Sequence, residues 1–214
     1  MPVREDIISL LKERRYHDLL ALPHSRNKIF GKLISLSYDK TSLISWRAIE
    51  AAGLLTGAIS KSDPEFVRNF VGRLLWMISD ESGGICWSAP EMLGEIARNS
   101  PELCSDIASI IASFHKETML TSGVLWALGR IGRTDAGMVN YSVPIILDYL
   151  KSSDQTLRGY AAWALGEIRP QGVIYGLEKL RDDKNTFTLY DEGELKETSV
   201  GEIASEALAK IAEK

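Results

Sequence analysis

The sequence repeats a short pattern of small and branched apolar residues at the interval of a helix pair, and this feature constrains the fold more than any other. Three segments align without gaps around a central glycine: Met92–Ile96, Ala127–Ile131 and Ala164–Ile168. Ala207–Ile211 is a fourth copy with alanine at the glycine position, and Trp46–Gly53 shares the pattern W-x-A-x-E-x-x-G with Trp87–Gly94. The five small anchors lie 41, 35, 37 and 43 residues apart. Such periods are typical of stacked helix pairs.

The recurring small residue indicates that neighbouring helices come close at that position. Glycine and alanine let helix backbones approach, while the adjacent leucine and isoleucine fill the seam. Because glycine inside a helix costs roughly 1 kcal/mol relative to alanine, its recurrence at one position predicts a steric requirement there. Apolar residues at helical spacing predict further helices between and before the anchors. These segments are Ile7–Leu22, Lys28–Leu36, Glu65–Ile78, Leu103–Phe114 and Val143–Leu150.

One segment near the C-terminus departs from the helical pattern. Residues 186–190 and 194–198 alternate in polarity on either side of Asp191-Glu192-Gly193, which predicts a short β-hairpin. Ser199 and Glu202 then form a capping-box pattern that starts the final helix. We interpret the hairpin as a cover for the end of the core; the alternative is an edge that binds a partner.

Together these features predict an all-α fold, a right-handed α-α solenoid of the HEAT-like or armadillo-like kind, with one short β-hairpin near the C-terminus. The whole chain, 1–214, is expected to form a single domain. Its expected parts are a divergent N-terminal helix pair (1–40), helix-pair repeats (41–181), the hairpin insertion (182–199) and a terminal helix (200–214).

The segment Arg158–Ile168, with the sequence RGYAAWALGEI, resembles the repeat of the HEAT-like family named after the phycobilisome (PBS) lyases. The resemblance covers roughly residues 42–214 and implies the solenoid architecture, whereas the segment before it fits only loosely. Members of this superfamily include scaffolds, lyase subunits, hydroxylases and DNA glycosylases, so the resemblance implies no single activity. The hydroxylases carry repeated His-Glu motifs, which this chain lacks.

Composition limits the classes of partner. The chain has a formal net charge of −4, which argues against nucleic acid because neutralising phosphates supplies most of the affinity of nucleic-acid-binding proteins. No apolar stretch has the length of a membrane span, and the charged first residues do not match a signal peptide. The only two cysteines, Cys86 and Cys104, fit a reducing compartment. A cytoplasmic location is therefore expected.

The sequence carries no motif for a metal, a cofactor or a catalytic group. The three histidines, His17, His24 and His115, are scattered, and no zinc-ligand spacing occurs. Neither a Gly-x-Ser-x-Gly motif nor a phosphate-binding glycine loop is present. We therefore expect no cofactor and no metal site, and we assign no catalytic residue.

The second helix of each repeat is expected to line the concave surface of the solenoid, where partners of repeat proteins bind. Positions seven and three residues before the small anchor and one residue after it share a helical face. This stripe and the loop before its second helix supply the candidate partner-binding residues, which are Trp46, Glu50, Glu81, Trp87, Glu91, Glu95, Trp126, Arg130, Trp163 and Glu167. Tryptophans among carboxylates could stack on a cationic ligand or take a basic peptide. Alternatively, the rings pack between repeats and the charged residues form a ladder of ion pairs.

The loop that carries Glu81 is rich in glycine. The segment Asp80–Trp87 contains two adjacent glycines just before an expected helix N-terminus, where backbone amides could receive an anion. Because no phosphate-loop motif accompanies them, we favour a tight turn between two helices.

These observations favour a non-enzymatic binding or scaffold module that engages a protein or peptide. One alternative is a DNA-acting enzyme of the HEAT-like alkylpurine glycosylase type. In that resemblance Trp87, Trp126, Trp163 and Asp80 would match the family's concave tryptophans and aspartate, but the acidic chain lacks the basic surface that duplex DNA requires. A second alternative is a lyase-type subunit, for which the chain offers only the shared repeat.

Overall fold

The structure is a computed structural model that describes residues 3–79 and 86–213. The described part consists mostly of helices, with one two-stranded antiparallel sheet near the C-terminus, so the predicted fold class is confirmed. The chain divides into two compact units, Met1–Cys104 and Ser105–Lys214, which are called unit 1 and unit 2 below.

Unit 1 is helical throughout its regular structure. Its elements are α1 (Val3–Lys12), a 3-10 helix (Tyr16–Ala21), α2 (Arg26–Leu36), α3 (Leu43–Ser60), α4 (Pro64–Ile78) and α5 (Ala89–Asn99). The prediction of one continuous helix over Ile7–Leu22 is wrong, because α1 ends at Lys12. Arg14 takes a left-handed backbone conformation (φ 56°), and the amide of Arg15 donates to the carbonyl of Leu10 at 2.9 Å. This arrangement closes the helix, as left-handed residues commonly do at helix C-termini.

Unit 2 adds the hairpin to its helices. Its elements are α6 (Ile107–Ser113), α7 (Thr121–Thr134), α8 (Val143–Tyr149), α9 (Gln155–Ile168), α10 (Ile174–Glu178), β1 (Thr186–Asp191), β2 (Glu194–Ser199) and α11 (Val200–Ala212), with short 3-10 helices at Phe114–Lys116, Ala136–Met138 and Asn140–Ser142. Helix α6 begins four residues later than predicted, because the preceding residues form turns after Pro101. Helix α10 has only five residues and was not predicted.

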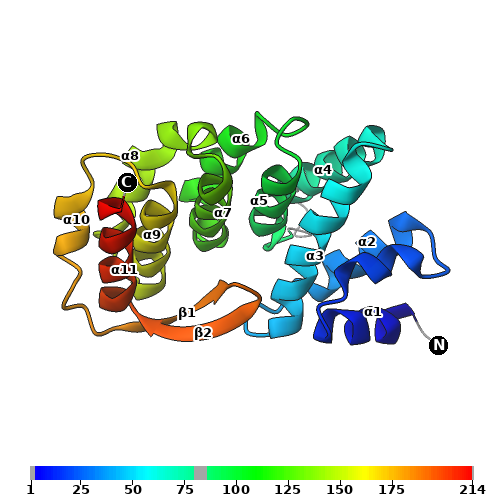
Figure 1. Cartoon of the computed structure of the whole chain (residues 1–214), viewed down its shortest axis with the longest axis horizontal. Coiled ribbons are helices and arrows are strands. Elements are labelled where there is room, and N and C mark those ends of the chain that lie inside the picture. The colour runs from blue at the N-terminus through cyan, green and yellow to red at the C-terminus, as the bar shows by residue number, and fades with distance from the viewer. Residues whose placement is uncertain (1–2, 80–85, 214) are drawn as a thin grey trace. The chain divides into compact units, whose positions relative to one another are not determined.

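The small anchors lie where helices from successive repeats meet. Helix α3 packs along α5 in unit 1, and α9 packs between α7 and α11 in unit 2 (Figure 1). A Cβ atom added to Gly53 would stand 2.7 Å from the carbonyl carbon of Glu95, and one added to Gly129 would stand 3.0 Å from the Cα of Ala164. Gly166 approaches α11 just as closely. The steric requirement inferred from the recurring glycine is therefore confirmed.

The predicted hairpin is present, with each strand one residue longer than expected. Thr186 pairs with Ser199 at the open end, and Asp191 pairs with Glu194 beside the turn. Ser199 also accepts a hydrogen bond from the amide of Glu202, whose side chain bonds back to the Ser199 amide. The predicted capping box thus links the end of β2 directly to the first turn of α11.

The hairpin lies against the helices of its own unit. Strand β1 runs across α9, and its far end reaches α7 (Figure 1). The hydroxyl of Tyr160 on α9 donates to the carbonyl of Thr188 at 3.1 Å, and Trp126 Nε1 on α7 donates to the carbonyl of Tyr190 at 2.9 Å. Carbonyls two residues apart lie on the same edge of a strand. The two helices therefore donate hydrogen bonds to two carbonyls on the edge of β1 that does not face β2.

Candidate functional site

Helices α3 and α5 carry the unit 1 part of the predicted stripe, and most of it is covered. Four of its residues are buried: Trp46, Glu50, Glu91 and Glu95. Trp87 lies just before α5 rather than on the helix, and it is 46% exposed. Glu81 lies outside the described residues. The stripe in this unit is thus an internal layer with one accessible ring at its edge.

Each buried carboxylate of unit 1 has a nearby donor. The hydroxyl of Tyr16 donates to Glu50 Oε2 at 2.8 Å, and Lys40 Nζ lies 2.6 Å from Glu91 Oε1. Burial and the charge of Glu50 raise the pKa of Tyr16 to about 12. Arg98 pairs with Glu95 at 3.1 Å. Each of the three buried carboxyl groups therefore has at least one polar contact, whereas Glu91 Oε2 has no hydrogen-bond partner in the described structure.

In unit 2 the stripe forms a layered stack of rings and guanidinium groups. The rings of Trp126 and Trp163 are buried and nearly parallel, with their centroids 6.2 Å apart. Arg130 lies over the Trp126 ring at 5.3 Å, and Arg133 lies over the Trp163 ring at 5.6 Å. Trp126 Nε1 is bonded to β1, whereas Trp163 Nε1 has no hydrogen-bond partner in the described structure. The stack joins α7 to α9 beneath the hairpin.

Charged residues around the stack link helices α7, α9 and α11 of unit 2 and the hairpin. Arg133 on α7 pairs with Glu167 on α9, and it also meets Asp191 at 2.9 Å and Glu192 at 2.6 Å in the hairpin. Lys210 on α11 pairs with Glu167 at 2.6 Å. Sequence reasoning placed Glu167 on the stripe but missed Arg133. The sequence feature that could have indicated Arg133 is its spacing of four residues from Gly129, because residues four apart lie one turn apart on the same face of a helix.

The pairing of Glu167 predicts a pH-dependent contribution to stability. Burial alone would raise the pKa of Glu167, but hydrogen bonds from Arg133 and Lys210 outweigh it and hold the pKa below its ordinary value of 4.5. Because the pKa of Glu167 is lower in the folded than in the unfolded chain, its ionised form stabilises the fold at pH values above the unfolded-state pKa. This stabilisation is lost as the pH falls through the folded-state pKa. We expect Glu167→Gln to lower the free energy of unfolding by about 2 kcal/mol at pH 7.

Urea unfolding at several pH values checks this expectation. The difference in stability between the unsubstituted chain and Glu167→Gln should shrink as the pH falls from neutral towards 3, because the carboxyl then becomes protonated. A difference that stays constant over this range would show that Glu167 is not held ionised by Arg133 and Lys210.

The burial of three tryptophans fits the interpretation that they pack between repeats. Trp46, Trp126 and Trp163 expose almost no ring surface in this structure, so they offer no face on which a ligand could stack. The ion pair between Glu167 and Lys210 is one step of the ladder of ion pairs that this interpretation includes. Direct binding of a partner by the stripe residues stays a prediction.

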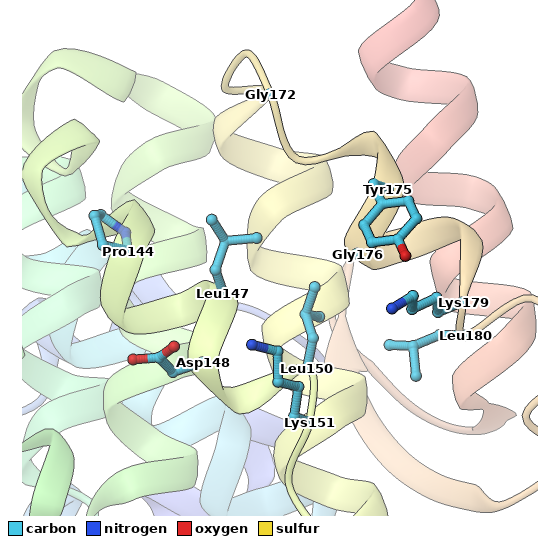
Figure 2. A pocket seen from close by; sticks show the side chains of 10 residues that line it. All are labelled: Pro144, Leu147, Asp148, Leu150, Lys151, Gly172, Tyr175, Gly176, Lys179 and Leu180. Carbon is cyan, nitrogen blue, oxygen red and sulfur yellow. The ribbon is translucent and has the colours of Figure 1, made fainter.

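An open apolar groove lies elsewhere in unit 2, between α8 and the segment around α10. Figure 2 shows side chains from these two segments facing a shared space. Its volume is about 580 Å³, which lies within the range of ligand pockets. The groove is lined by Pro144, Leu147, Asp148, Leu150, Lys151, Gly172, Tyr175, Gly176, Lys179 and Leu180. Leucines form its floor, while Tyr175 is 74% exposed.

The rim of the groove is cationic. Lys151 and Lys179 line it together with one carboxylate, Asp148, and all three side chains are exposed. Lys179 Nζ lies 4.2 Å from the centre of the Tyr175 ring, which is a cation–π distance. Neither lysine forms an ion pair with a described residue. The groove therefore combines an apolar floor with two positive charges that are available to a ligand.

The described residues contain neither a cluster of metal-ligating side chains nor a helix that could span a membrane. No group of three or more His, Cys, Asp or Glu side chains among residues 3–79 and 86–213 is arranged to hold a metal ion. None of the described helices combines the length and the apolar character needed to cross a membrane.

Comparison with known proteins identifies the fold. No family model matches the sequence, and no curated protein matches it. Several solved structures of designed proteins are similar. An engineered protein with 17% identity and a TM-score of 0.56 matches the whole of this chain, which spans 59% of that protein's length. A designed armadillo repeat protein in complex with the peptide (KR)4 has 13% identity and a TM-score of 0.55. The match covers 99% of this chain and 100% of the designed protein.

A third similar structure is a computationally designed armadillo repeat protein for modular peptide recognition. It has 13% identity and a TM-score of 0.52, and the match covers 97% of this chain and 91% of the designed protein. At such identities the likeness extends to the fold alone. The chain therefore has an armadillo-like helical-repeat fold.

Proposed function

We propose that this chain is a non-enzymatic peptide-binding module, and that the groove between α8 and α10 takes an apolar side chain of an acidic peptide segment. The observation that carries the proposal is an open apolar groove with two exposed lysines on its rim, neither of which forms an ion pair with a described residue. Helical-repeat folds commonly serve as binding scaffolds, and two of the similar designed proteins are described by the peptides they bind or recognise.

The chemistry of the groove selects the kind of peptide. A leucine floor formed by Leu147, Leu150 and Leu180 favours one or two apolar side chains, because burying them removes apolar surface from water. Lys151 and Lys179 outnumber Asp148, so carboxylates beside the apolar anchor would gain favourable electrostatic interactions. A basic peptide would meet like charges on the rim.

The buried stripe has a supporting role in this proposal. The stack of Trp126 and Trp163 and the ion pairs of Glu167 hold α7, α9 and α11 together, which fixes the frame that carries the groove. The resemblance of Arg158–Ile168 to the HEAT-like repeats of the PBS-lyase type is consistent with a scaffold of this kind, since the resembling residues are helix-packing residues.

Filling the groove tests the proposal. A side chain at Gly176 would enter the groove, since an added Cβ would meet only terminal methyl carbons of Leu150 (2.8 Å) and Leu147 (3.7 Å). We expect Gly176→Leu to weaken binding of acidic peptides by at least about tenfold, while the helical circular-dichroism signal and unfolding midpoint are retained. The probes are fluorescent nonapeptides with a central Leu or Phe flanked by Asp and Glu.

Two controls make the result specific. Gly72→Leu introduces the same change on α4, where an added Cβ meets no atom within 4 Å, and it should leave binding unchanged. Matching peptides flanked by Lys and Arg should bind at least about tenfold more weakly than the acidic set. Equal binding by Gly176→Leu and the unsubstituted chain would remove the groove from the proposal.

A further inference from the structure

The two strands of the hairpin differ in what lies beside their outer edges. The outer edge of β1 receives hydrogen bonds from Tyr160 on α9 and Trp126 on α7. Strand β2 pairs with β1 alone among the described strands. In Figure 1, no element of unit 2 runs along the side of β2 that faces away from β1. The hairpin therefore keeps one strand edge that its own unit does not pair.

The pairing register shows which backbone groups of β2 face this open side. Leu195 lies opposite Tyr190, and Glu197 lies opposite Thr188. In an antiparallel ladder, hydrogen-bonded pairs alternate with pairs whose backbone groups point away from each other. The carbonyls of Tyr190 and Thr188 bond the helices, so both pairs are of the second kind. The N–H and C=O groups of Leu195 and Glu197 therefore point to the outer side of β2.

These four backbone groups have no hydrogen-bond partner among the described residues. The next group along this edge is taken, because the N–H of Ser199 donates to Glu202 Oε2 at 2.9 Å. The open edge is thus a short segment with two donors and two acceptors. A strand added at such an edge gains its main-chain hydrogen bonds from these groups.

The side chains along the open edge carry opposite charges. Lys196 and Glu197 are both exposed, and Lys196 forms no ion pair with a described residue. In an added antiparallel strand, the residue opposite Glu197 immediately precedes the residue opposite Lys196. A basic residue followed by an acidic one would therefore make two favourable cross-strand pairs. The next residue would lie opposite Leu195, which favours an apolar side chain.

We propose that the outer edge of β2 binds an extended segment of another protein, which adds a third, antiparallel strand with the order basic, acidic, apolar. The four backbone groups supply the hydrogen bonds, and Lys196 and Glu197 select the register. Charged side chains on an edge strand also disfavour indiscriminate pairing, so they restrict the edge to a strand of complementary charge. This site is separate from the α8–α10 groove and does not depend on the function proposed for it.

A second copy of the chain fits the edge less well than such a segment. Antiparallel pairing of two β2 strands through all four groups of Leu195 and Glu197 would place Lys196 of one copy opposite Lys196 of the other. Like charges directly opposite each other are destabilising. Shifting this register by two residues in either direction brings the edge against the turn or against the capped Ser199. Both shifts reduce the number of hydrogen bonds.

Nuclear magnetic resonance of the full chain tests the edge with two peptides of equal composition. The acetylated and amidated hexapeptide Thr-Val-Lys-Glu-Val-Thr has the proposed order, and Thr-Val-Glu-Lys-Val-Thr reverses the two charges. We expect the first peptide to shift the amide signals of Leu195 and Glu197 in a saturable manner and to slow their hydrogen exchange at least about tenfold. The amides of Lys196 and Thr198 already face β1 and should change less. The charge-reversed peptide should bind about fivefold more weakly.

Two substitutions at one position separate the backbone from the side chain. Glu197→Pro removes the outward N–H at a position that proline tolerates in an edge strand, whereas Glu197→Ala removes the same charge and keeps the N–H. Glu197→Pro should bind the first peptide at least about tenfold more weakly than Glu197→Ala. The indole N–H signal of Trp126, which is bonded to the Tyr190 carbonyl, should be unchanged in both variants and so report an intact hairpin.

Three results would overturn the proposal. The first is the absence of saturable changes at the Leu195 and Glu197 amides with several millimolar peptide, or equal binding by the two Glu197 variants. The second is equal or stronger binding of the charge-reversed peptide, which would contradict the antiparallel order of charges. The third is protection of the same two amides that rises with the concentration of the chain alone, which would identify a second copy as the occupant.

Discussion

Replacing Gly53 by alanine is expected to lower the free energy of unfolding by about 3 kcal/mol. The new Cβ would stand 2.5 Å from the Cβ of Glu95 and 2.7 Å from its carbonyl carbon and oxygen. Backbone atoms of α5 have no rotamer that relieves this overlap, so the two helices must separate. The separation would loosen the whole α3–α5 contact, which is a main contact of unit 1.

The sign of this effect makes it informative. In an ordinary exposed helix, glycine to alanine is stabilising by up to about 1 kcal/mol. Gly72→Ala on α4 provides this comparison within the same unit, because an added Cβ there meets no atom within 4 Å. Urea unfolding followed by circular dichroism should show opposite shifts for the two variants. Stabilisation by Gly53→Ala would contradict the close approach of α3 and α5.

Truncation of Trp126 is expected to have the largest effect in unit 2. Its side chain is fully buried, stacks on Trp163 and donates a hydrogen bond to the carbonyl of Tyr190. Trp126→Ala should therefore cost about 3–5 kcal/mol of unfolding free energy. It should also increase hydrogen exchange of the amides of β1, because the strand loses its contact with α7.

Two comparisons separate the ring from its hydrogen bond. Trp126→Phe keeps much of the ring volume but leaves the Tyr190 carbonyl without this donor. In Trp163→Phe no such hydrogen bond is lost, because Trp163 Nε1 has no partner in the described structure. Trp126→Phe should therefore lower the free energy of unfolding by about 1 kcal/mol more than Trp163→Phe. Tyr175→Ala, at an exposed position of the same unit, should change stability by less than about 0.5 kcal/mol. A small loss for Trp126→Ala would contradict the stacked arrangement beneath the hairpin.

The helical repeat could be predicted because its signals are local. Glycine recurs at positions such as Gly53 and Gly129 because a larger side chain would strike the next helix, and that requirement is visible as a periodic small residue. The hairpin was equally visible, since alternation of polarity and the capping box at Ser199 depend only on neighbouring residues. The break after α1 was missed because Arg14 has no sequence feature that marks a left-handed conformation.

The surfaces were harder to predict because they depend on contacts between distant segments. Periodicity places Trp126 on one face of a helix, but the strand that covers this face contributes Tyr190, 64 residues further along the chain. The α8–α10 groove forms where Leu147 and Tyr175 meet, and the five residues of α10 are too few to show a helical period. Sequence reasoning therefore placed the stripe residues on their helices, whereas it gave no indication of the groove between α8 and α10.

Methyl and indole signals of one isotopically labelled sample test the proposed binding site most directly. On addition of an acidic peptide with a central leucine, we expect saturable shifts of the methyl groups of Leu147, Leu150 and Leu180, which line the groove. The indole N–H signals of Trp126 and Trp163 should stay unchanged, because both rings are buried. Shifts of the indole signals without shifts of these leucines would contradict the account and return the binding site to the tryptophan stripe.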